Sequence, residues 1–496
     1  MTDIRHIAAA ASRDYTSFDV VIVGSGPSGS IAARTLAEKG CHVAVLEYGG
    51  LVSQGALYGP HQAAYSKART SSHGRADGNP WTACAVGGGM EFYNAITFRY
   101  RQADLSASQY LRTDMEIDWP IALQDLEPFY SEIENLLEIS GTNGFRPYPA
   151  SPRGLLISDA MQELGIKAKS IPLAIRQPKT TNGCIECSGC DDLVCPTDAK
   201  ANIRTRSILD DSALPGTISV LYGCFVNAIE LRNDCRAEAL ECYVPLSSRR
   251  IRIPVKTVIV CANAIQSAAL MLRSTSRHAP TGIGNDSDLV GRGLSFKISG
   301  YSVGYMKNTA PVPAHWGPHA TVYTDDFYEH PDVPCRFGGL IYEANFPSPG
   351  DNIGLVRLHY IAGEEPWSHN RVMLDAAIDP HGVPYVRIAY KNSENDLARI
   401  SFLANRAEDT LRRLGASCIE RMPFSRGKGS CHLHGTMRAG SDPKTSVADR
   451  YGRIHGLTNI YVMDGSVMNF AGNSNPTHTI MANARRMALS LAERGN

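Results

Sequence analysis

Residues 18–29 read FDVVIVGSGPSG, a short β-branched run that passes directly into a glycine-rich turn. The run predicts a buried strand of a parallel sheet, and the residues that follow it predict a helix. Gly24 permits the tight turn, Gly26 lets the backbone approach a pyrophosphate, and Gly29 lets the helix pack closely on the strand. We therefore expect this turn, including Ser28, to bind dinucleotide phosphates at the start of the helix.

A second strand pattern, residues 42–46, ends in Glu47. Glu47 lies 18 residues after Gly29, about where a carboxylate that binds the ribose of a dinucleotide is expected. A lone glycine fingerprint is weak evidence, whereas strand, glycines, helix, strand and acid in this order are specific. The order predicts a Rossmann-type fold of the α/β class. The alternative is a coincidental glycine-rich turn.

A second glycine cluster, Gly87-Gly88-Gly89, precedes Asn94. Glycines here would let backbone N–H groups reach the phosphates or the ring of a bound cofactor. A glycine-rich surface loop is the alternative. The first fingerprint is compatible with both NAD and FAD. The second glycine cluster is the motif that separates the two, in favour of FAD.

Length and charge restrict the class of protein. The chain has 496 residues, which predicts two or three domains because a domain holds roughly 100–200 residues. Lys and Arg together number 49, as do Asp and Glu, which argues against nucleic acid or an anionic membrane as the main partner. No apolar run approaches the roughly 18–20 residues of a membrane span, and residues 1–17 do not have a signal-peptide pattern. We expect a cytoplasmic enzyme.

Four of the thirteen cysteines are clustered at Cys184, Cys187, Cys190 and Cys195. Their spacing is close to the iron–sulfur run of ferredoxins, with one extra residue before the last cysteine. Four thiolates this close could hold an iron–sulfur cluster or zinc, or could form two disulfides. Since the spacing is near the pattern but not on it, we favour a loop without metal.

The C-terminal part of the chain concentrates residues suited to proton transfer. His432 and His434 are two residues apart, and His478 follows Asn475 closely. Histidine suits general-base chemistry because its pKa lies near neutrality. A buried histidine with a structural role is the alternative at each position.

These motifs follow one another along nearly the whole chain, and in that order the chain resembles the glucose–methanol–choline (GMC) flavin oxidoreductases. The matching segments are Gly24 to Gly29 with Glu47, Gly87 to Asn94, Asp118-Trp119-Pro120, residues 258–267, Gly291-Arg292-Gly293, His432-x-x-Gly435-Thr436, and Asp464-Gly465-Ser466 followed by Asn475-Pro476-Thr477. The ordered set is more specific than any one of its motifs.

The resemblance implies FAD as the cofactor and His432 as the catalytic base. It also implies that Asn475 holds the substrate hydroxyl in line with flavin N5. His434 and His478 lie off the matched positions and are possible supporting residues. Some members carry a histidine that is bonded covalently to the flavin, but Ala85 stands at the matching position, so we expect non-covalent FAD.

Further FAD contacts follow from the same resemblance. The backbone of Val226 is expected at the adenine. Asp464 and Gly465 are expected to contact FAD through backbone N–H groups. Pro476 and Thr477 precede a helix whose N-terminus is expected to face the pyrimidine edge of the flavin.

The resemblance also implies two domains. Residues 1–110, 181–298 and 425–496 are expected to form a discontinuous, Rossmann-type FAD-binding domain. Residues 111–180 and 299–424 are expected to form a substrate domain with an antiparallel (α+β) sheet.

The expected reaction is oxidation of an alcohol to an aldehyde or ketone. The base takes the hydroxyl proton while a hydride passes from carbon to flavin N5, and O2 or another acceptor then reoxidises the flavin. Asp118-Trp119-Pro120 and Arg438-x-Gly440 resemble the sugar-oxidising members, such as pyranose oxidase and the gluconate and fructose dehydrogenases. The chain also looks similar to aminoglycoside 6′-alcohol oxidoreductases of antibiotic biosynthesis. We expect a sugar, amino sugar or aminoglycoside as substrate, with a non-carbohydrate alcohol as the alternative.

Two other functional classes are weighed against this one. A flavin monooxygenase that uses NAD(P)H would need a nicotinamide site, and the sequence has no second GxGxxG. An electron-transfer flavoprotein would use the four-cysteine cluster. The sequence indicates neither the electron acceptor nor the oligomeric state.

Overall fold

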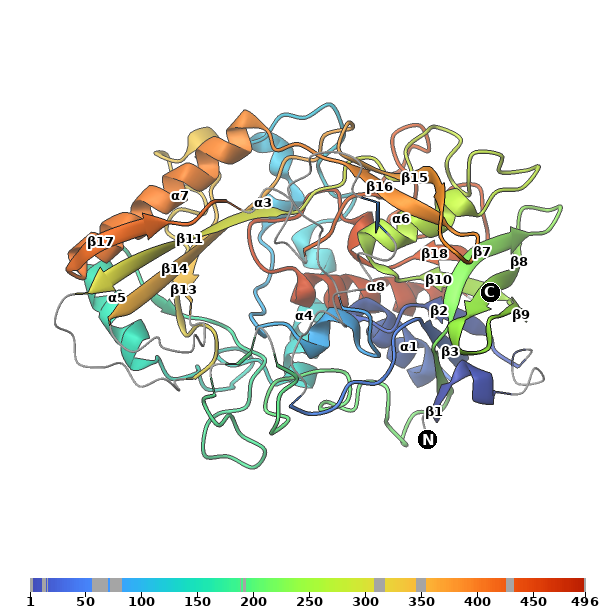
Figure 1. Ribbon diagram of the computed structural model, residues 1–496, viewed down its shortest axis with the longest axis horizontal. Coiled ribbons are helices and arrows are strands. Elements are labelled where there is room, and N and C mark those ends of the chain that lie inside the picture. The colour runs from blue at the N-terminus through green and yellow to red at the C-terminus, as the bar shows by residue number, and fades with distance from the viewer. Residues whose placement is uncertain are drawn as a thin grey trace.

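The computed structural model describes residues 3–10, 15, 17–55, 70–71, 83–187, 189–190, 193–306, 317–344, 354–424 and 432–494. Two sheets of six strands each organise these residues, one parallel and one antiparallel. Figure 1 shows the antiparallel sheet at one end of the molecule and the parallel sheet at the other.

The parallel sheet has the strand order β1-β6-β3-β2-β10-β18. Its strands are β1 (Asp3–His6), β6 (Thr217–Tyr222), β3 (His42–Glu47), β2 (Val20–Val23), β10 (Thr257–Val260) and β18 (Ile460–Val462). Three distant stretches of sequence therefore form one sheet. The strands predicted before the glycine fingerprint and before the ribose-binding acid are β2 and β3, so the Rossmann-type fold is confirmed.

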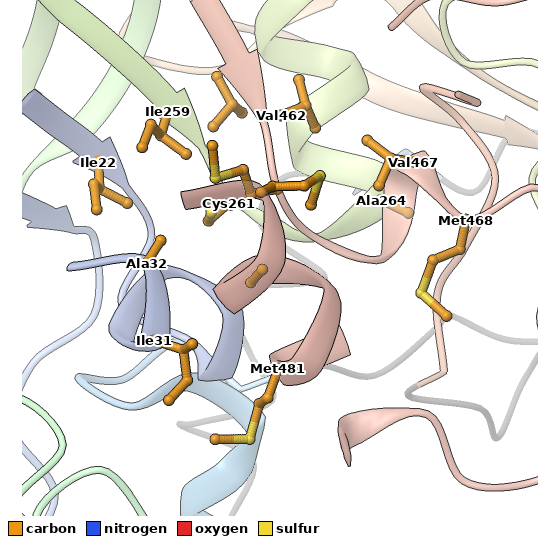
Figure 2. Close-up of a cluster of buried hydrophobic side chains, with 14 of the residues drawn as sticks. Ile22, Ile31, Ala32, Ile259, Cys261, Ala264, Val462, Val467, Met468 and Met481 are labelled. Atoms are coloured by element: carbon orange, nitrogen blue, oxygen red, sulfur yellow. The ribbon is translucent and has the colours of Figure 1, made fainter. Parts of the chain in front are cut away.

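Helix α1 (Pro27–Glu38) packs on this sheet, and α8 (Thr477–Arg494) packs on α1. Figure 2 shows the buried side chains between them, including Ile22 of β2, Ile31 of α1 and Met481 of α8. Burying a side chain of this size stabilises a fold by roughly 1.5–3 kcal/mol. The cluster therefore fixes the start of α1 at the end of β2, where the glycine fingerprint lies.

The antiparallel sheet has the order β17-β11-β14-β13-β12-β5. Its strands are β17 (Ala416–Arg421), β11 (Lys297–Met306), β14 (Leu355–Gly363), β13 (Leu340–Glu343), β12 (Val322–Thr324) and β5 (Lys169–Ser170). Helix α7 (Glu394–Arg413) covers one face, as Figure 1 shows, and buries Ile298 of β11 and Leu358 of β14. Since side chains alternate along a strand, the residues between these point to the other face.

Besides short 3-10 helices, the described elements include two three-stranded sheets and four further α-helices. These are β7 (Phe225–Leu231), β8 (Ala237–Val244), β9 (Arg249–Pro254), β15 (Arg371–Ile378), β16 (Pro384–Ala389), β4 (Thr70–Ser71), α3 (Gln102–Leu105), α4 (Glu127–Leu137), α5 (Pro152–Glu163) and α6 (Asn263–Arg273). No helix in the described part of the chain has the length and apolarity to cross a bilayer. The domain boundaries stay a prediction.

Candidate active site

A cavity of about 680 Å³ extends from the parallel sheet to the antiparallel sheet. At one end it is lined by Val23 and Glu47, at the carboxyl ends of β2 and β3. At the other end it is lined by residues of β11, β13 and β14. Ligands of open α/β sheets bind outside the carboxyl ends of the strands, so the position of the cavity suits a nucleotide cofactor.

The glycines of the fingerprint fit a ligand that lies against the backbone. Gly24 has φ +104°, and a Cβ there would lie 2.3 Å from the carbonyl oxygen of Cys261. A Cβ on Gly29 would lie 2.0 Å from the Gly24 carbonyl oxygen, which accounts for the close packing of α1. A Cβ on Gly26 would instead meet no described atom within 4 Å and would enter the cavity. Gly26 is therefore where a ligand reaches the backbone.

Replacing Gly26 with alanine tests this cradle. The added methyl group meets no neighbour in the protein, so the variant is expected to fold with the wild-type melting temperature. It occupies ligand space, and overpacking of this kind predicts an increase of about 10- to 100-fold in the FAD dissociation constant. Titration of the apoprotein with FAD, followed by fluorescence, measures the change. Gly50→Ala is the matched control, because Gly50 is exposed, also has open space at its Cβ and does not line the cavity.

Glu47 is held in place by its neighbours. Its Oε2 atom accepts hydrogen bonds from the Ser25 amide (3.0 Å) and hydroxyl (2.7 Å), and its Oε1 atom accepts one from the Gly49 amide at 2.8 Å. Burial raises the pKa of Glu47, and these hydrogen bonds oppose that rise. Glu47 also lines the cavity, so its fixed carboxyl group lies where a ribose hydroxyl could approach it.

Most of the predicted cofactor-binding residues line the cavity. They are Gly24, Gly26, Ser28, Glu47, Gly88, Asn94, Val226, Asp464, Gly465, Pro476 and Thr477. Gly29 and Gly87 lie behind this lining, where Gly29 packs on the turn and the Gly87 amide donates to the Ser25 hydroxyl at 3.0 Å. Asp464 is fixed by the Ser267 hydroxyl, which donates to Oδ2 at 2.6 Å, and burial raises its pKa.

His432 and Asn475 line the same cavity, toward the antiparallel sheet. His432 is half-buried, and burial together with the Lys297 ammonium holds the pKa of its imidazole well below the usual range. Its ring is therefore neutral at physiological pH and can accept a proton. The Asn475 side chain is 3% exposed, and its Oδ1 atom has no hydrogen-bond partner in the described structure. A buried amide oxygen without a partner is unfavourable, so Asn475 suits a bound ligand.

The other two histidines lie outside the cavity lining. His478 is fully buried, its ring meets Tyr130 edge-on at 4.7 Å, and Nε2 lies 3.1 Å from the Tyr130 carbonyl oxygen. Burial lowers the pKa of His478 to about 4. His434 is also fully buried, and its backbone amide donates to the carbonyl oxygen of Ser295 at 3.1 Å. His478 packs inside the fold, whereas neither ring nitrogen of His434 has a hydrogen-bond partner in the described structure. The supporting roles of His434 and His478 stay predictions.

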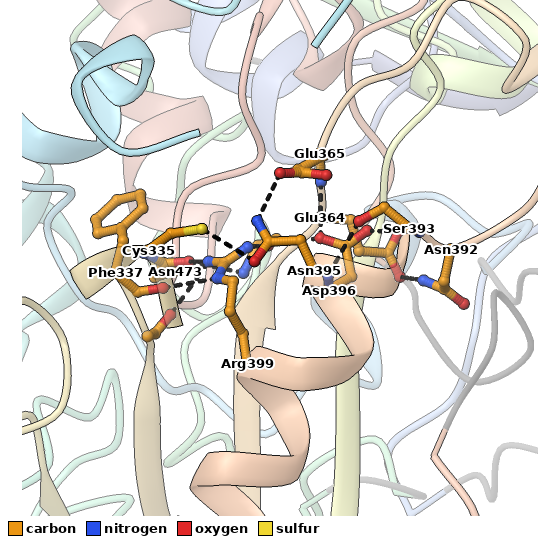
Figure 3. A network of polar contacts seen from close by, with 12 residues as sticks. Cys335, Phe337, Glu364, Glu365, Asn392, Ser393, Asn395, Asp396, Arg399 and Asn473 are labelled. Atoms are coloured by element: carbon orange, nitrogen blue, oxygen red, sulfur yellow. Dashed lines mark hydrogen bonds and ion pairs between the residues drawn. The ribbon is translucent and has the colours of Figure 1, made fainter. Parts of the chain in front are cut away.

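The loop before Asn475 is anchored through Asn473. The Asn473 amide donates to Asp104 Oδ1 at 3.0 Å, and its own Oδ1 atom accepts from the Gly363 amide at 2.8 Å. Figure 3 shows Arg399 reaching from α7 to the same side chain, with Nη2 3.0 Å from Asn473 Oδ1. The antiparallel sheet and helix α7 therefore hold the loop that carries Asn475.

Arg399 is fully buried among carboxyl groups. Asp396 lies 3.5 Å away, and Glu365 accepts from Asn395 at 2.7 Å in the same network (Figure 3). Burial raises the pKa of Asp396 to about 6 and that of neighbouring Glu364 to about 7. The Arg399 guanidinium opposes this rise at Asp396.

The antiparallel sheet contributes residues that the sequence reasoning missed. Lys297, Ser299 and Tyr301 alternate along β11 and line the cavity, as do His359 of β14 and Tyr342 of β13. A polar residue at every second position of a strand is the signal that indicates such a face. The buried Lys297 ammonium donates to the Tyr100 hydroxyl at 3.0 Å.

Comparisons with known proteins identify the family of this chain. Residues 83–298 and 366–484 match models described as GMC oxidoreductase, and residues 22–56 match an NAD(P)-binding Rossmann-like domain. The chain is also 36% identical to paromamine 6'-oxidase of Streptomyces fradiae, over 97% of this chain and 92% of that one. The chain belongs to the GMC oxidoreductase family. The family and its Rossmann-like domain imply FAD, and FAD-dependent oxidation of an alcohol is the activity that fits.

Other GMC relatives agree with this assignment. The 6'''-hydroxyparomomycin C oxidase of Streptomyces lividus is 36% identical, over 96% of this chain and 91% of that one. Among solved structures, pyridoxine 4-oxidase from Mesorbium loti superposes with a TM-score of 0.69 at 18% identity, covering 97% of this chain and 100% of that one. That structural likeness shows the fold alone.

The four clustered cysteines of this GMC chain form no disulfide in the described structure. Lys200 ties their loop together, because its Nζ atom donates to the carbonyl oxygens of Cys190 (2.8 Å) and Tyr93 (2.9 Å). No three His, Cys, Asp or Glu side chains are grouped to hold a metal ion in the described part of the chain, which omits residues 188, 191 and 192. Of the alternatives that the spacing left open, two disulfides among these four cysteines are therefore excluded in the described structure.

Proposed function

We propose that this enzyme oxidises a hydroxyl group of an amino sugar or aminoglycoside to a carbonyl group, with non-covalently bound FAD. One observation carries the proposal: a neutral imidazole, His432, and the unpartnered carboxamide oxygen of Asn475 line one cavity together with the nucleotide fingerprint. The substrate class is supported by the two Streptomyces relatives, which are named for paromamine and a hydroxyparomomycin. A cytoplasmic location stays a prediction.

Different residues of the chain have different roles in the proposed reaction. FAD, when bound, supplies the acceptor for the hydride. His432 takes the proton of the substrate hydroxyl, for which its imidazole must be neutral. The Nδ2 group of Asn475 can donate a hydrogen bond to the substrate oxygen as negative charge develops there, and its unpartnered Oδ1 atom can accept one from a substrate hydroxyl. The turn at Gly26 and the acid at Glu47 would hold the cofactor, and residues of the antiparallel sheet line the part of the cavity left for the substrate.

The low pKa of His432 predicts the pH dependence of the reaction. The neutral ring is the active form, so kcat/KM is expected to stay level around neutral pH and to fall only as the pH drops through the lowered pKa. Lys297 contributes to this lowering, so Lys297→Met should raise the pKa and move the acid limb to higher pH. Measuring kcat/KM against pH for both proteins tests this. An acid limb that stays in place or moves to lower pH would contradict it.

Anaerobic mixing tests the function itself. We expect paromamine to bleach the flavin absorbance of the FAD-loaded protein faster than simple alcohols do. Rapid bleaching by NADPH would instead favour a monooxygenase and contradict the proposal.

Acid precipitation tests the mode of FAD binding, since non-covalent flavin is released into the supernatant whereas covalent flavin stays in the pellet.

A further inference from the structure

Three side chains form a row across the antiparallel sheet. Tyr301 of β11 and Tyr342 of β13 are both register partners of His359, which lies between them on β14. The His359 ring stacks on Tyr301, with centroids 4.2 Å apart and planes 14° apart, and meets Tyr342 edge-on at 4.6 Å. Directly opposed residues point to the same face of a sheet, and all three line the cavity.

The two ring nitrogens of His359 are unused by the protein. The residue is 8% exposed, and neither Nδ1 nor Nε2 has a hydrogen-bond partner in the described structure. Burial, followed by the nearby rings of His319 and His432, holds the pKa of His359 well below the usual range. A neutral imidazole has one donor and one acceptor. It is unfavourable to leave a buried donor and a buried acceptor without hydrogen-bond partners. The unpaired nitrogens of His359 therefore indicate a ligand on this side of the cavity.

A hydroxyl group is the ligand chemistry that matches. It both donates and accepts, as the neutral ring requires. A charged amine suits the position less well, because the Lys297 ammonium lines the same end of the cavity. The acids of the lining, Glu47 and Asp464, are already hydrogen-bonded near the nucleotide fingerprint and Ser267.

We propose that His359 is a specificity-determining residue that binds a second substrate hydroxyl, close to the one that is oxidised. Tyr301 and Tyr342 hold the imidazole in its plane, so that its nitrogens face the cavity. The preferred substrate is then a polyhydroxylated ring, and its amino groups lie away from this row. The inference rests on the proposed function, because it assigns a contact to that substrate.

The test compares His359→Phe with wild-type holoenzyme, using paromamine as the substrate. Phenylalanine retains the aromatic packing but has no donor or acceptor, so KM is expected to rise about tenfold while kcat changes less than about threefold. His359→Gln restores a donor and an acceptor and is expected to bring KM back to within about threefold of wild type. His278→Phe, at an exposed histidine outside the cavity lining, is the matched control and should leave both constants unchanged.

The outcomes separate this inference from the function on which it rests. If wild-type flavin is bleached by neither paromamine nor D-glucose, the proposed function fails and the inference fails with it. If the wild type is active and His359→Phe keeps its KM, the inference alone is overturned. His359→Phe could instead lose FAD and melt at a lower temperature at the same time as its KM for paromamine rises. That result also overturns the inference, because His359 would then have a structural role.

Discussion

Replacing His432 with alanine is expected to slow anaerobic flavin reduction by the best substrate by about 100- to 10,000-fold. His432 lines the cavity as a neutral base, and its loss leaves no group placed to take the hydroxyl proton in the same way. FAD content should be unchanged, because the fingerprint and Glu47 lie toward the other end of the cavity. Stopped-flow absorbance of the flavin gives the rate.

His369→Ala is the control for this experiment, since His369 is exposed and does not line the cavity. It should reduce its flavin at the wild-type rate. Bleaching of the His432→Ala flavin at that same rate would remove His432 as the base. A loss of FAD from this variant would mean that His432 acts through the cofactor site.

Replacing Arg399 with leucine is expected to lower the free energy of unfolding by about 3–5 kcal/mol. The guanidinium is fully buried and donates to the carbonyl oxygens of Phe337 (2.6 Å) and Gly363 (2.8 Å) as well as to Asn473. Its removal leaves the buried carboxyl of Asp396 without its cation, so the pKa of Asp396 should rise further. Urea unfolding of the holoenzyme measures the loss of stability.

Arg406→Leu, on the same helix, is the matched control. Arg406 pairs with Asp409 at 3.1 Å near the surface, where such a pair contributes about 1 kcal/mol or less. Equal stability of Arg399→Leu and wild type would show that the network around α7 does not stabilise the fold.

A weaker substrate affinity in Arg399→Leu is also expected, because Arg399 would no longer hold Asn473 and, through it, the loop that carries Asn475.

The nucleotide half of the site could be predicted because its signal is local. The spacing of Gly24, Gly26 and Gly29 between a strand and a helix is a property of a dozen consecutive residues. The structure has the close packing at Gly29 and the open space at Gly26 that this spacing implies. His432 and Asn475 needed the order of several motifs along the chain.

The substrate half could not be predicted, because it depends on strand register. Tyr301, His359 and Tyr342 meet only because β11, β14 and β13 pair in one register, and no local pattern specifies which distant residues oppose each other. The same limit applies to His432 and His434. They are close in sequence, but only the structure shows that one lines the cavity and the other lies beneath it.

The parallel sheet has a consequence for how this chain is synthesised. Its edge strand β18 pairs with β10, about 200 residues earlier, and Asn475 and Thr477 of the cavity lining come later still. The cavity therefore cannot be complete until Asn475 and Thr477 have left the ribosome. During translation β10 has an unpaired edge, which is open to association with other nascent chains. FAD can only stabilise the finished chain, so flavin supply and chaperone protection should both limit the yield of active enzyme.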